Sequence, residues 1–215
     1  GITLAGKYYH FKDQAPLILF FHGYRGTALR DGNGILLYAQ KMGYNALLVD
    51  QRGHGKSGGK AITFGIKERY DCMDWIRYAN RRFGEHTPIV LAGISMGAST
   101  VLMTSDLGLP VNVKGIIADC PYSSPKGILR AVMKQIKFPV NVTYTAVRLG
   151  GKIFGRFDIE EHSVVESMKN CYVPVLFIHG GEDYFVPCEM SEECFEACGS
   201  LDKKRIVVDG AAHGM

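Results

Sequence analysis

One serine of the chain lies in a pattern that could make it a nucleophile. Ser95 is the central residue of the G-x-S-x-G motif at 93–97, between an apolar β-branched run (88–92) and a run that opens on small residues (98–103). A strand that turns directly into a helix needs glycine around the turning residue, because a Cβ there would strike the neighbouring backbone. The turn pushes the hydroxyl out above a helix N-terminus that favours negative charge. The pattern therefore indicates a nucleophilic serine.

A serine hydroxyl becomes a nucleophile when an imidazole takes its proton and a carboxylate holds that imidazole in the right tautomer. His213 and Asp183 are the candidates for these roles, and the three residues follow the chain order Ser, Asp, His. The rival carboxylates are Asp119, which follows an expected strand, and Asp209, which lies so close to His213 in sequence that we expect it to shape a turn. We therefore predict that Ser95, Asp183 and His213 meet in one site.

The remaining histidines have less suitable surroundings. His22 and His179 stand in strand-end His-Gly pairs, and His54 lies in a glycine-rich loop, so we expect these three to be structural. Three others lie away from the motifs and are expected at the surface: His10, His86 and His162.

The elements that must position these residues alternate between buried strands and helices. Short apolar runs without polar alternation predict strands buried on both faces, and the alternation indicates parallel βαβ units with helices on both sheet faces. In such sheets ligands bind beyond the C-terminal ends of the strands, where every candidate residue lies. The expected strands cover residues 2–11, 17–21, 46–49, 88–92, 113–120, 173–178 and 205–208, and the main helices 34–42, 64–82 and 188–199.

A segment between two expected strands departs from this alternation and predicts a small helical cap at about residues 122–170. It is too long for one crossover helix, and from Cys120 to Phe157 it contains no aspartate or glutamate. Its basic face has three interpretations: a solvated surface, which we favour, contact with anionic lipid headgroups, or recognition of an acidic substrate group. The residues at helical spacing are Lys126, Arg130, Lys134 and Lys137, opposite an apolar stripe of Ile128, Leu129, Val132, Met133 and Ile136.

Composition suits one globular domain over residues 1–215. The chain is 47% hydrophobic and 21% charged, and its net charge of +4 does not argue for nucleic acid as a partner. Its six cysteines follow no C-x-x-C pattern; reduced thiols are favoured over a disulfide or metal site at Cys194 and Cys198. With no signal peptide or membrane-spanning run, these features predict a cytoplasmic protein. We also expect the native chain to extend beyond both ends, so an upstream anchor stays open.

Five motifs follow one another along the chain: HGYRG (22–26), DQRGHGKSGG (50–59), GISMG (93–97), HGGEDYFVP (179–187) and AAHG (211–214). Taken together and in this order, they resemble those of the α/β-hydrolase superfamily, with the greatest likeness to its bacterial serine esterase and acylaminoacyl-peptidase-like branch. The resemblance implies a mostly parallel central sheet with helices on both faces, a helical cap insertion and a Ser-His-Asp triad. It also implies an oxyanion hole made by the backbone N–H groups of Tyr24 and Met96. By the same resemblance, we expect a leading strand and a final helix of the fold to lie outside this sequence.

Several other chemistries are disfavoured by the residues present. Dehalogenases of this superfamily carry aspartate where this chain has Ser95, and no cluster of histidine and acidic residues has the spacing of metal ligands. The loop at 50–59 lacks the G-x-x-x-x-G-K-[ST] spacing of a phosphate loop. We therefore predict neither a metal nor a cofactor.

Three functions remain open from the sequence. The leading one is a serine hydrolase that cleaves carboxylic esters of small or medium acyl chains, with a partly hydrophobic substrate because the cap stripe is apolar. The second is an acylaminoacyl-peptidase-like or exopeptidase-like amide hydrolase. The third is a non-catalytic binding module on the same scaffold, against which the intact set of Ser95, Asp183 and His213 argues.

Overall fold

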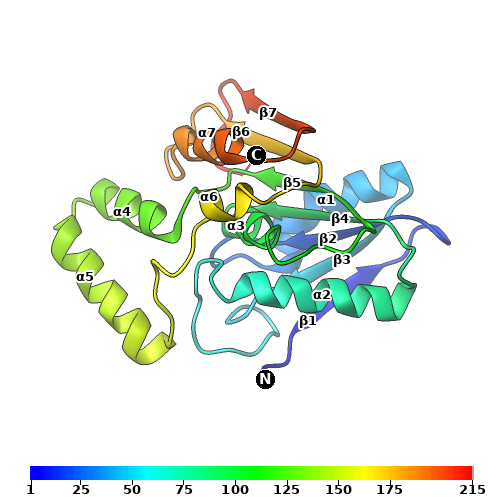
Figure 1. Cartoon of the computed structure of the whole chain (residues 1–215), viewed down its shortest axis with the longest axis horizontal. Helices are drawn as coiled ribbons and strands as arrows, with labels where there is room; N and C mark the ends of the chain where they lie inside the picture. The colour runs from blue at the N-terminus through cyan, green and yellow to red at the C-terminus, as the bar shows by residue number, and fades with distance from the viewer. Residues whose placement is uncertain (215) are drawn as a thin grey trace.

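A seven-stranded sheet forms the centre of the protein in the computed structural model, which describes residues 1–214 (Figure 1). The strand order is β1-β3-β2-β4-β5-β6-β7; β1 is antiparallel to β3, and all other neighbours are parallel. This confirms the predicted α/β-hydrolase fold. The strands are β1 (Ala5–Tyr9), β2 (Leu17–Phe21), β3 (Asn45–Asp50), β4 (Ile89–Ile94), β5 (Val113–Asp119), β6 (Val175–Gly180) and β7 (Lys203–Val208).

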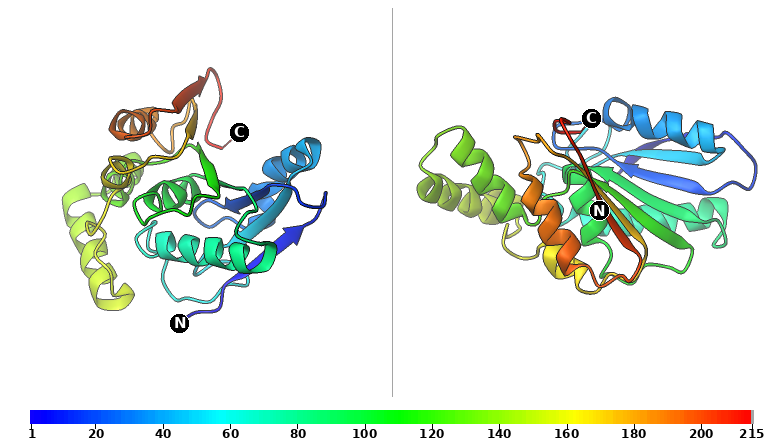
Figure 2. Two further views of the ribbon diagram at one scale, coloured as in Figure 1. Left: turned by 45° about the vertical axis from the view of Figure 1, so that its right-hand side comes forward. Right: turned by 90° about the horizontal axis from the view of Figure 1, so that it is seen from above.

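Helices cover both faces of this sheet, and Figure 2 shows α1 and α2 on opposite sides of it. The helices within residues 1–214 are α1 (Ala28–Met42), α2 (Glu68–Phe83), α3 (Met96–Met103), α4 (Pro125–Gln135), α5 (Val140–Gly150), the π-helix η1 (Gly151–Gly155), α6 (Val164–Met168) and α7 (Cys188–Ala197).

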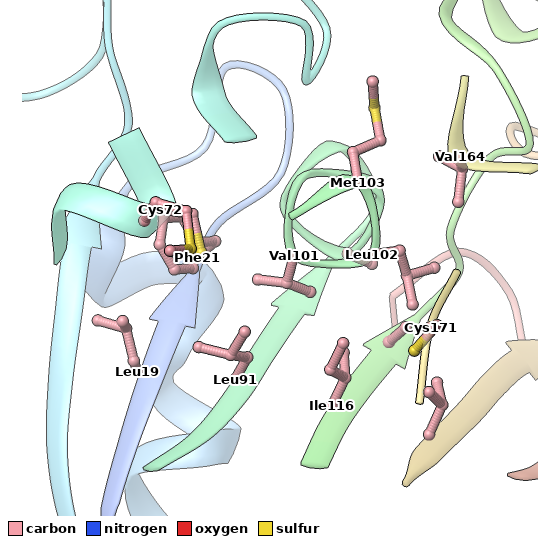
Figure 3. Packing of buried hydrophobic residues seen from close by; sticks show 14 of the residues in the cluster. Leu19, Phe21, Cys72, Leu91, Val101, Leu102, Met103, Ile116, Val164 and Cys171 are labelled. Carbon is pink, nitrogen blue, oxygen red and sulfur yellow. The ribbon is translucent and has the colours of Figure 1, made fainter. Parts of the chain in front are cut away.

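Alternate residues of β2 enter two different apolar clusters, as the two-residue period of a strand requires. Leu19 and Phe21 join the larger cluster, which includes Val101 and Leu102 of α3, and Figure 3 shows these side chains together. Phe20 belongs instead to the smaller cluster on the α1 side. Since β2 is fully buried between the two clusters, it anchors the loop that follows it.

Two helices begin at other positions than the sequence patterns predicted. Helix α1 begins at Ala28, well before residue 34, because the Thr27 side chain accepts the N–H of Arg30 and caps it. Gly32 weakens the helical pattern there; a Cβ on it would lie 3.1 Å from the Phe20 ring, so glycine permits close packing on the sheet. Helix α2 begins at Glu68 rather than 64, after a turn that its first side chain holds by accepting backbone N–H groups.

The segment between β5 and β6 contains four helices, α4 to α6 with η1, and Figure 1 shows α4 and α5 standing apart from the sheet. Ser124 caps α4 by accepting the N–H of Gly127. Ile128 and Met133 are buried as the apolar stripe predicted, but Ile136 lies beyond the end of α4 and is exposed, which corrects that part of the prediction. No helix formed by residues 1–214 has both the length and the apolar character needed to cross a membrane.

Ion pairs fasten α4 and α5 to the chain that returns to the sheet. Arg148 pairs with Asp158 at 2.8 Å and with Glu160 at 2.7 Å, while Lys126 contacts Glu160 and Lys152 contacts Asp158. Hydrogen bonds from Arg148 and Lys152 hold the pKa of the Asp158 carboxyl below its usual range. The acidic residues just past Phe157 therefore neutralise part of the basic charge that the sequence places in this segment.

Candidate active site

Ser95 occupies a tight turn between β4 and α3. Its backbone has φ 55° and ψ −118°, a conformation that costs energy for any residue with a side chain. A Cβ on Gly93 would overlap the backbone of Gly97, and a Cβ on Gly97 would overlap the carbonyl of Phe21. The two glycines are thus required by the close approach of strand and helix, and the turn leaves Ser95 at the N-terminus of α3.

Asp183 lies on the turn after β6 with both carboxylate oxygens engaged. One oxygen accepts the backbone N–H groups of Phe185 (2.9 Å) and Val186 (2.8 Å). The other contacts Nδ1 of His213 at 2.6 Å and Nε2 of His179 at 3.3 Å. Burial acts to raise the pKa of this carboxyl, but the hydrogen bonds from the two histidines outweigh it and lower the pKa well below its usual range. Asp183 is therefore ionised at neutral pH.

The contact with Asp183 fixes which nitrogen of His213 carries the proton. An ionised carboxylate can only accept a hydrogen bond, so Nδ1 of His213 donates and Nε2 of the neutral ring is left as the basic nitrogen. The loop that carries His213 is tied to the Asp183 turn by the hydrogen bond from the N–H of Glu182 to the carbonyl of Ala211 (2.9 Å). Residues far apart in sequence are thereby held together at the ends of β6 and β7.

A cavity of about 230 Å³ joins Ser95 to His213. Gly23, Tyr24 and Phe185 line it as well, and the rings of Phe185 and His213 lie 5.2 Å apart. Within residues 1–214, no hydrogen bond links the Ser95 hydroxyl to the ring of His213. Contacts of this kind commonly tighten only when substrate is bound.

The rival carboxylates do not contact His213. Asp119 ends β5, where burial raises its pKa, and it accepts a hydrogen bond from the Cys120 thiol at 3.2 Å. Asp209 is exposed in the turn after β7. Of the three candidates, it is Asp183 that the structure brings against the imidazole.

The loop after β2 lies directly beside the nucleophile turn. A Cβ on Gly23 would be 3.4 Å from the Cβ of Ser95. His22 braces this loop: its Nδ1 donates to the carbonyl of Gly23 (2.7 Å) and its Nε2 accepts the N–H of Gln51 (3.0 Å). Burial lowers the pKa of His22, which agrees with this neutral, doubly hydrogen-bonded ring. The loop carries the Tyr24 N–H, and Tyr24 shares two cavities with Ser95.

His179 is a site residue whose role sequence reasoning missed. It is fully buried, and its Nε2 lies 3.0 Å from the carbonyl of Val186 and 3.3 Å from the Asp183 carboxylate. Because a carbonyl can only accept, Nε2 carries the hydrogen. The available signal was the four-residue spacing to Asp183 across a strand-end turn. His162, expected at the surface, is also partly buried and contacts Ser167 and Asp106.

One group of side chains in residues 1–214 could offer three ligand atoms to a metal ion. Donor atoms of Cys120, Asp183 and His213 all lie within 4.8 Å of one another. However, burial raises the pKa of the Cys120 thiol, so the thiolate that metals prefer is disfavoured, and the Asp183 oxygens already accept hydrogen bonds. The donor set fits a hydrogen-bonded site better than a metal centre.

A second cavity, of about 150 Å³, also opens against Ser95 and has apolar walls. Helix α4 supplies one wall and the loop before α2 supplies another, so the cavity lies between the sheet and the segment inserted after β5. The Tyr24 ring stacks on Phe64 at 5.6 Å at this cavity. Its lining residues are Tyr24, Phe64, Ser95, Met96, Tyr122, Ile128, Leu129, Val132 and Phe185.

Residues 12–168 match the family model described as serine aminopeptidase, S33. The chain belongs to this family. With it, the predicted membership of the α/β-hydrolase superfamily is confirmed. The serine aminopeptidase S33 match spans the nucleophile turn, the loop after β2 and all four helices inserted between β5 and β6, whereas Asp183 and His213 lie beyond it.

This S33 chain is similar to curated proteins at low sequence identity. The uncharacterized protein YqkD of Bacillus subtilis is 25% identical over 197 residues, which cover 91% of this chain and 64% of YqkD. The lysophosphatidylserine lipase ABHD12 of Rattus norvegicus is 27% identical over 191 residues, or 84% of this chain and 44% of that protein. This chain thus spans about half to two thirds of their length.

A solved structure with a similar fold is the esterase Pf2001 of Pyrococcus furiosus. It superposes with a TM-score of 0.76 and 25% identity over 99% of this chain and 79% of the esterase. These likenesses identify a hydrolase family whose structural neighbours include esterases; the reaction of this chain must be argued from its own residues.

Proposed function

We propose that this protein is a serine hydrolase that cleaves carboxylic esters through an acyl-enzyme intermediate. The observation that carries the proposal is the 2.6 Å contact between His213 and Asp183 beside the cavity that Ser95 lines. Together they supply the nucleophile, the base and the orienting carboxylate that ester cleavage requires. The intact set argues against a non-catalytic binding module.

In the proposed reaction Nε2 of His213 takes the hydroxyl proton of Ser95 while the serine oxygen bonds to the ester carbonyl carbon. The negative charge that develops on the carbonyl oxygen is held by the backbone N–H groups of Tyr24 and Met96. His213 then gives its proton to the alkoxide leaving group as the carbon–oxygen bond breaks. Water, deprotonated by His213, attacks the acyl carbon in the second half of the cycle. The bond between that carbon and the Ser95 oxygen then breaks, His213 returns the proton to the serine oxygen, and the acid is released. Asp183 keeps its charge throughout and stabilises the imidazolium.

The apolar cavity suggests which acyl groups fit. An apolar protein cavity of about 150 Å³ accommodates benzene, a molecule of six carbons. The cavity at Ser95 has about the same volume, 150 Å³. We therefore expect kcat/KM to rise from acetyl to butyryl and hexanoyl esters and to fall for dodecanoyl esters, in an assay of the p-nitrophenyl series.

An amide-cleaving reaction is the second candidate, because the matching family is described as serine aminopeptidase. An aminopeptidase must place a negative group near the free amine of its substrate. Asp31 is the acidic residue that lines the larger cavity, and its oxygens contact Arg30 (2.9 Å) and the N–H of Gly23 (2.9 Å). Because Asp31 already has these partners, we favour ester cleavage over amide cleavage. Faster hydrolysis of aminoacyl p-nitroanilides than of p-nitrophenyl esters would instead favour the amide reaction.

The decisive test is removal of the nucleophile. Ser95→Ala should lower kcat for ester hydrolysis by a factor on the order of 10⁶, and should abolish labelling by a fluorophosphonate probe. Circular dichroism serves as the control that the variant is folded. Wild-type activity in Ser95→Ala would refute the proposed nucleophile, and a folded native protein that the probe does not label would favour the non-catalytic module.

A further inference from the structure

The outer side of α5 is apolar although no element described covers it. In Figure 1, α5 is the outermost helix of the segment between β5 and β6, with α4 and η1 as its neighbours. Val142 is 73% exposed and Phe154 is 87% exposed, values far above those of a core residue. We call the following residues the outer apolar face: Ile136, Phe138, Val142, Ala146, Leu149, Ile153 and Phe154.

The spacing of four of these residues places them on one side of the helix, and Ile136, Phe138 and Phe154 adjoin them in sequence. Positions 142, 146 and 149 recur at intervals of four and three, which places them on one side of a helix, and 153 continues that line into η1. Tyr144, on the inner side, is buried and donates to Glu160 at 3.0 Å. The helix is thus apolar on both its inner and its outer side, and exposed apolar side chains gathered in this way mark an interaction site.

Rigid anchoring keeps this face turned outward. The ion pairs of Arg148 with Asp158 and Glu160 hold α5, and the amine of Lys67 donates to the carbonyl of Gly155 at 2.9 Å, which holds η1. Because these contacts fix both elements against the rest of the chain, burial of the outer apolar face requires an external partner.

Unpaired cations border the face. Lys134 and Lys137, at the end of α4, and Arg156, after η1, are exposed, and in the part of the chain that the structure describes none of them forms an ion pair. The nearby acidic residues Asp158 and Glu160 are neutralised by their own basic partners. The border of the outer apolar face is therefore positive.

We propose that the outer apolar face docks on a membrane surface rich in anionic lipid. Apolar side chains would enter the boundary between headgroups and acyl chains, while the bordering lysine and arginine side chains would contact lipid phosphates and carboxylates. A second copy of the chain fits less well. In a two-fold dimer the face would meet itself, and the border cations would face cations.

The test is sedimentation of the full chain with vesicles of pure phosphatidylcholine and with vesicles of equal parts phosphatidylcholine and phosphatidylserine, at low and high salt. Binding to the mixed vesicles should be strong at low salt, weaker at high salt and weakest on pure phosphatidylcholine. The assay reads binding alone, so Ser95→Ala should bind like the native chain, and the result is independent of the proposed reaction.

Two pairs of variants separate the contributions of the apolar face and of the charges. Leu149→Ser with Phe154→Ser should lower vesicle affinity at least tenfold, whereas the matched control Val111→Ser with Leu201→Ser, at exposed apolar positions elsewhere, should not.

Lys134→Gln with Lys137→Gln should lower affinity for mixed vesicles roughly 25-fold, about fivefold for each cation. Lys41→Gln with Lys60→Gln changes the net charge equally and should have little effect.

Three results would overturn the proposal. The first is failure of the native chain to bind mixed vesicles. The second is binding that all four double variants retain. The third is a concentration-dependent dimer, measured by analytical ultracentrifugation, that Leu149→Ser with Phe154→Ser dissociates while vesicles are not bound; that outcome would assign the face to a second copy. Hydrolysis of a water-soluble p-nitrophenyl ester should stay unchanged in this variant, which shows that it is folded.

Discussion

The Asp183 carboxylate concentrates more hydrogen bonds than any other residue of the candidate site. Two backbone N–H groups and two imidazoles converge on it in a fully buried position. Each donor favours the charged form, so the carboxylate is available to orient His213 without competing for its proton. The side chains of the site thus keep one buried carboxylate ionised inside the protein.

His179 should act as a positioning residue for that carboxylate. Removing its Nε2–H in His179→Leu should lower kcat roughly tenfold, since hydrogen bonds to charged groups contribute about 1.5–3 kcal/mol. It should also shift the acid limb of the kcat/KM profile to higher pH, because the carboxylate then holds the protonated His213 more strongly. His179→Gln can place an N–H near the same point and should restore most of the activity. Equal losses in the two variants would instead indicate that the residue only fills space.

The lowered pKa of Asp183 predicts a pH dependence of stability. The folded carboxyl releases its proton at lower pH than the same group in the unfolded chain, so in acid the unfolded state binds more protons. Stability from this group is present above the ordinary aspartate pKa of about 3.9 and is lost as pH falls below it. Urea midpoints between about pH 3 and pH 6 should therefore change less with pH in Asp183→Asn than in the native chain. Asp209→Asn, at an exposed carboxyl, is the control and should keep the native slope.

Sequence patterns predicted the role of a residue where its structural requirements lie within a few residues of chain. Ser95 was recognisable because its two glycines are needed within five residues of chain, and the structure shows the overlaps that a Cβ would create. The role of His179 was not recognisable. His-Gly pairs at strand ends are usually structural, and only the fold shows that the imidazole points at Asp183.

At the scale of elements, the turn between β4 and α3 depends on close backbone packing. Gly97→Ala should destabilise the protein by about 3 kcal/mol or prevent folding, because the new Cβ would overlap the carbonyl of Phe21. Gly34→Ala, on the exposed side of α1 with no atom near the added Cβ, should instead stabilise by about 0.5–1 kcal/mol. Urea denaturation of both variants measures the difference; similar stabilities would contradict the packing argument.

Strands were easier to predict than helix ends. The unbroken apolar runs of β2 and β3 identify buried strands directly, whereas the start of α1 depends on a cap at Thr27 and is obscured by the buried Gly32. Gly32 lets α1 pack closely on the sheet, although glycine is unfavourable within a helix. Tertiary contact thus overrides the local signal at that end.

At the scale of the whole molecule, the apolar cavity exists only because α4 faces the strand ends. In Val132→Phe the larger side chain on α4 should fill part of the cavity that a hexanoyl chain occupies. The kcat/KM for a hexanoyl ester should then fall at least tenfold, while that for an acetyl ester stays within a factor of about two. The ratio of the two rates checks this directly. An unchanged ratio would mean that acyl chains bind elsewhere.

The sequence predicted this large-scale arrangement in outline, as strand ends covered by a helical segment. It did not reveal the ion pairs that fix that segment, because Arg148 and Lys126 meet acidic partners only after the chain folds back. Nor did it show that Ile136 would be exposed next to α5, since its helical spacing continued the buried stripe.

The base of the proposed reaction, His213, lies on a short loop after β7. Backbone hydrogen bonds and the contact of the imidazole with Asp183 hold this loop to the turn after β6. Gradual heating should therefore produce two separate midpoints. Turnover would disappear when that loop detaches, while the ellipticity of the sheet persists to a higher temperature, and cooling before the second midpoint would restore the rate.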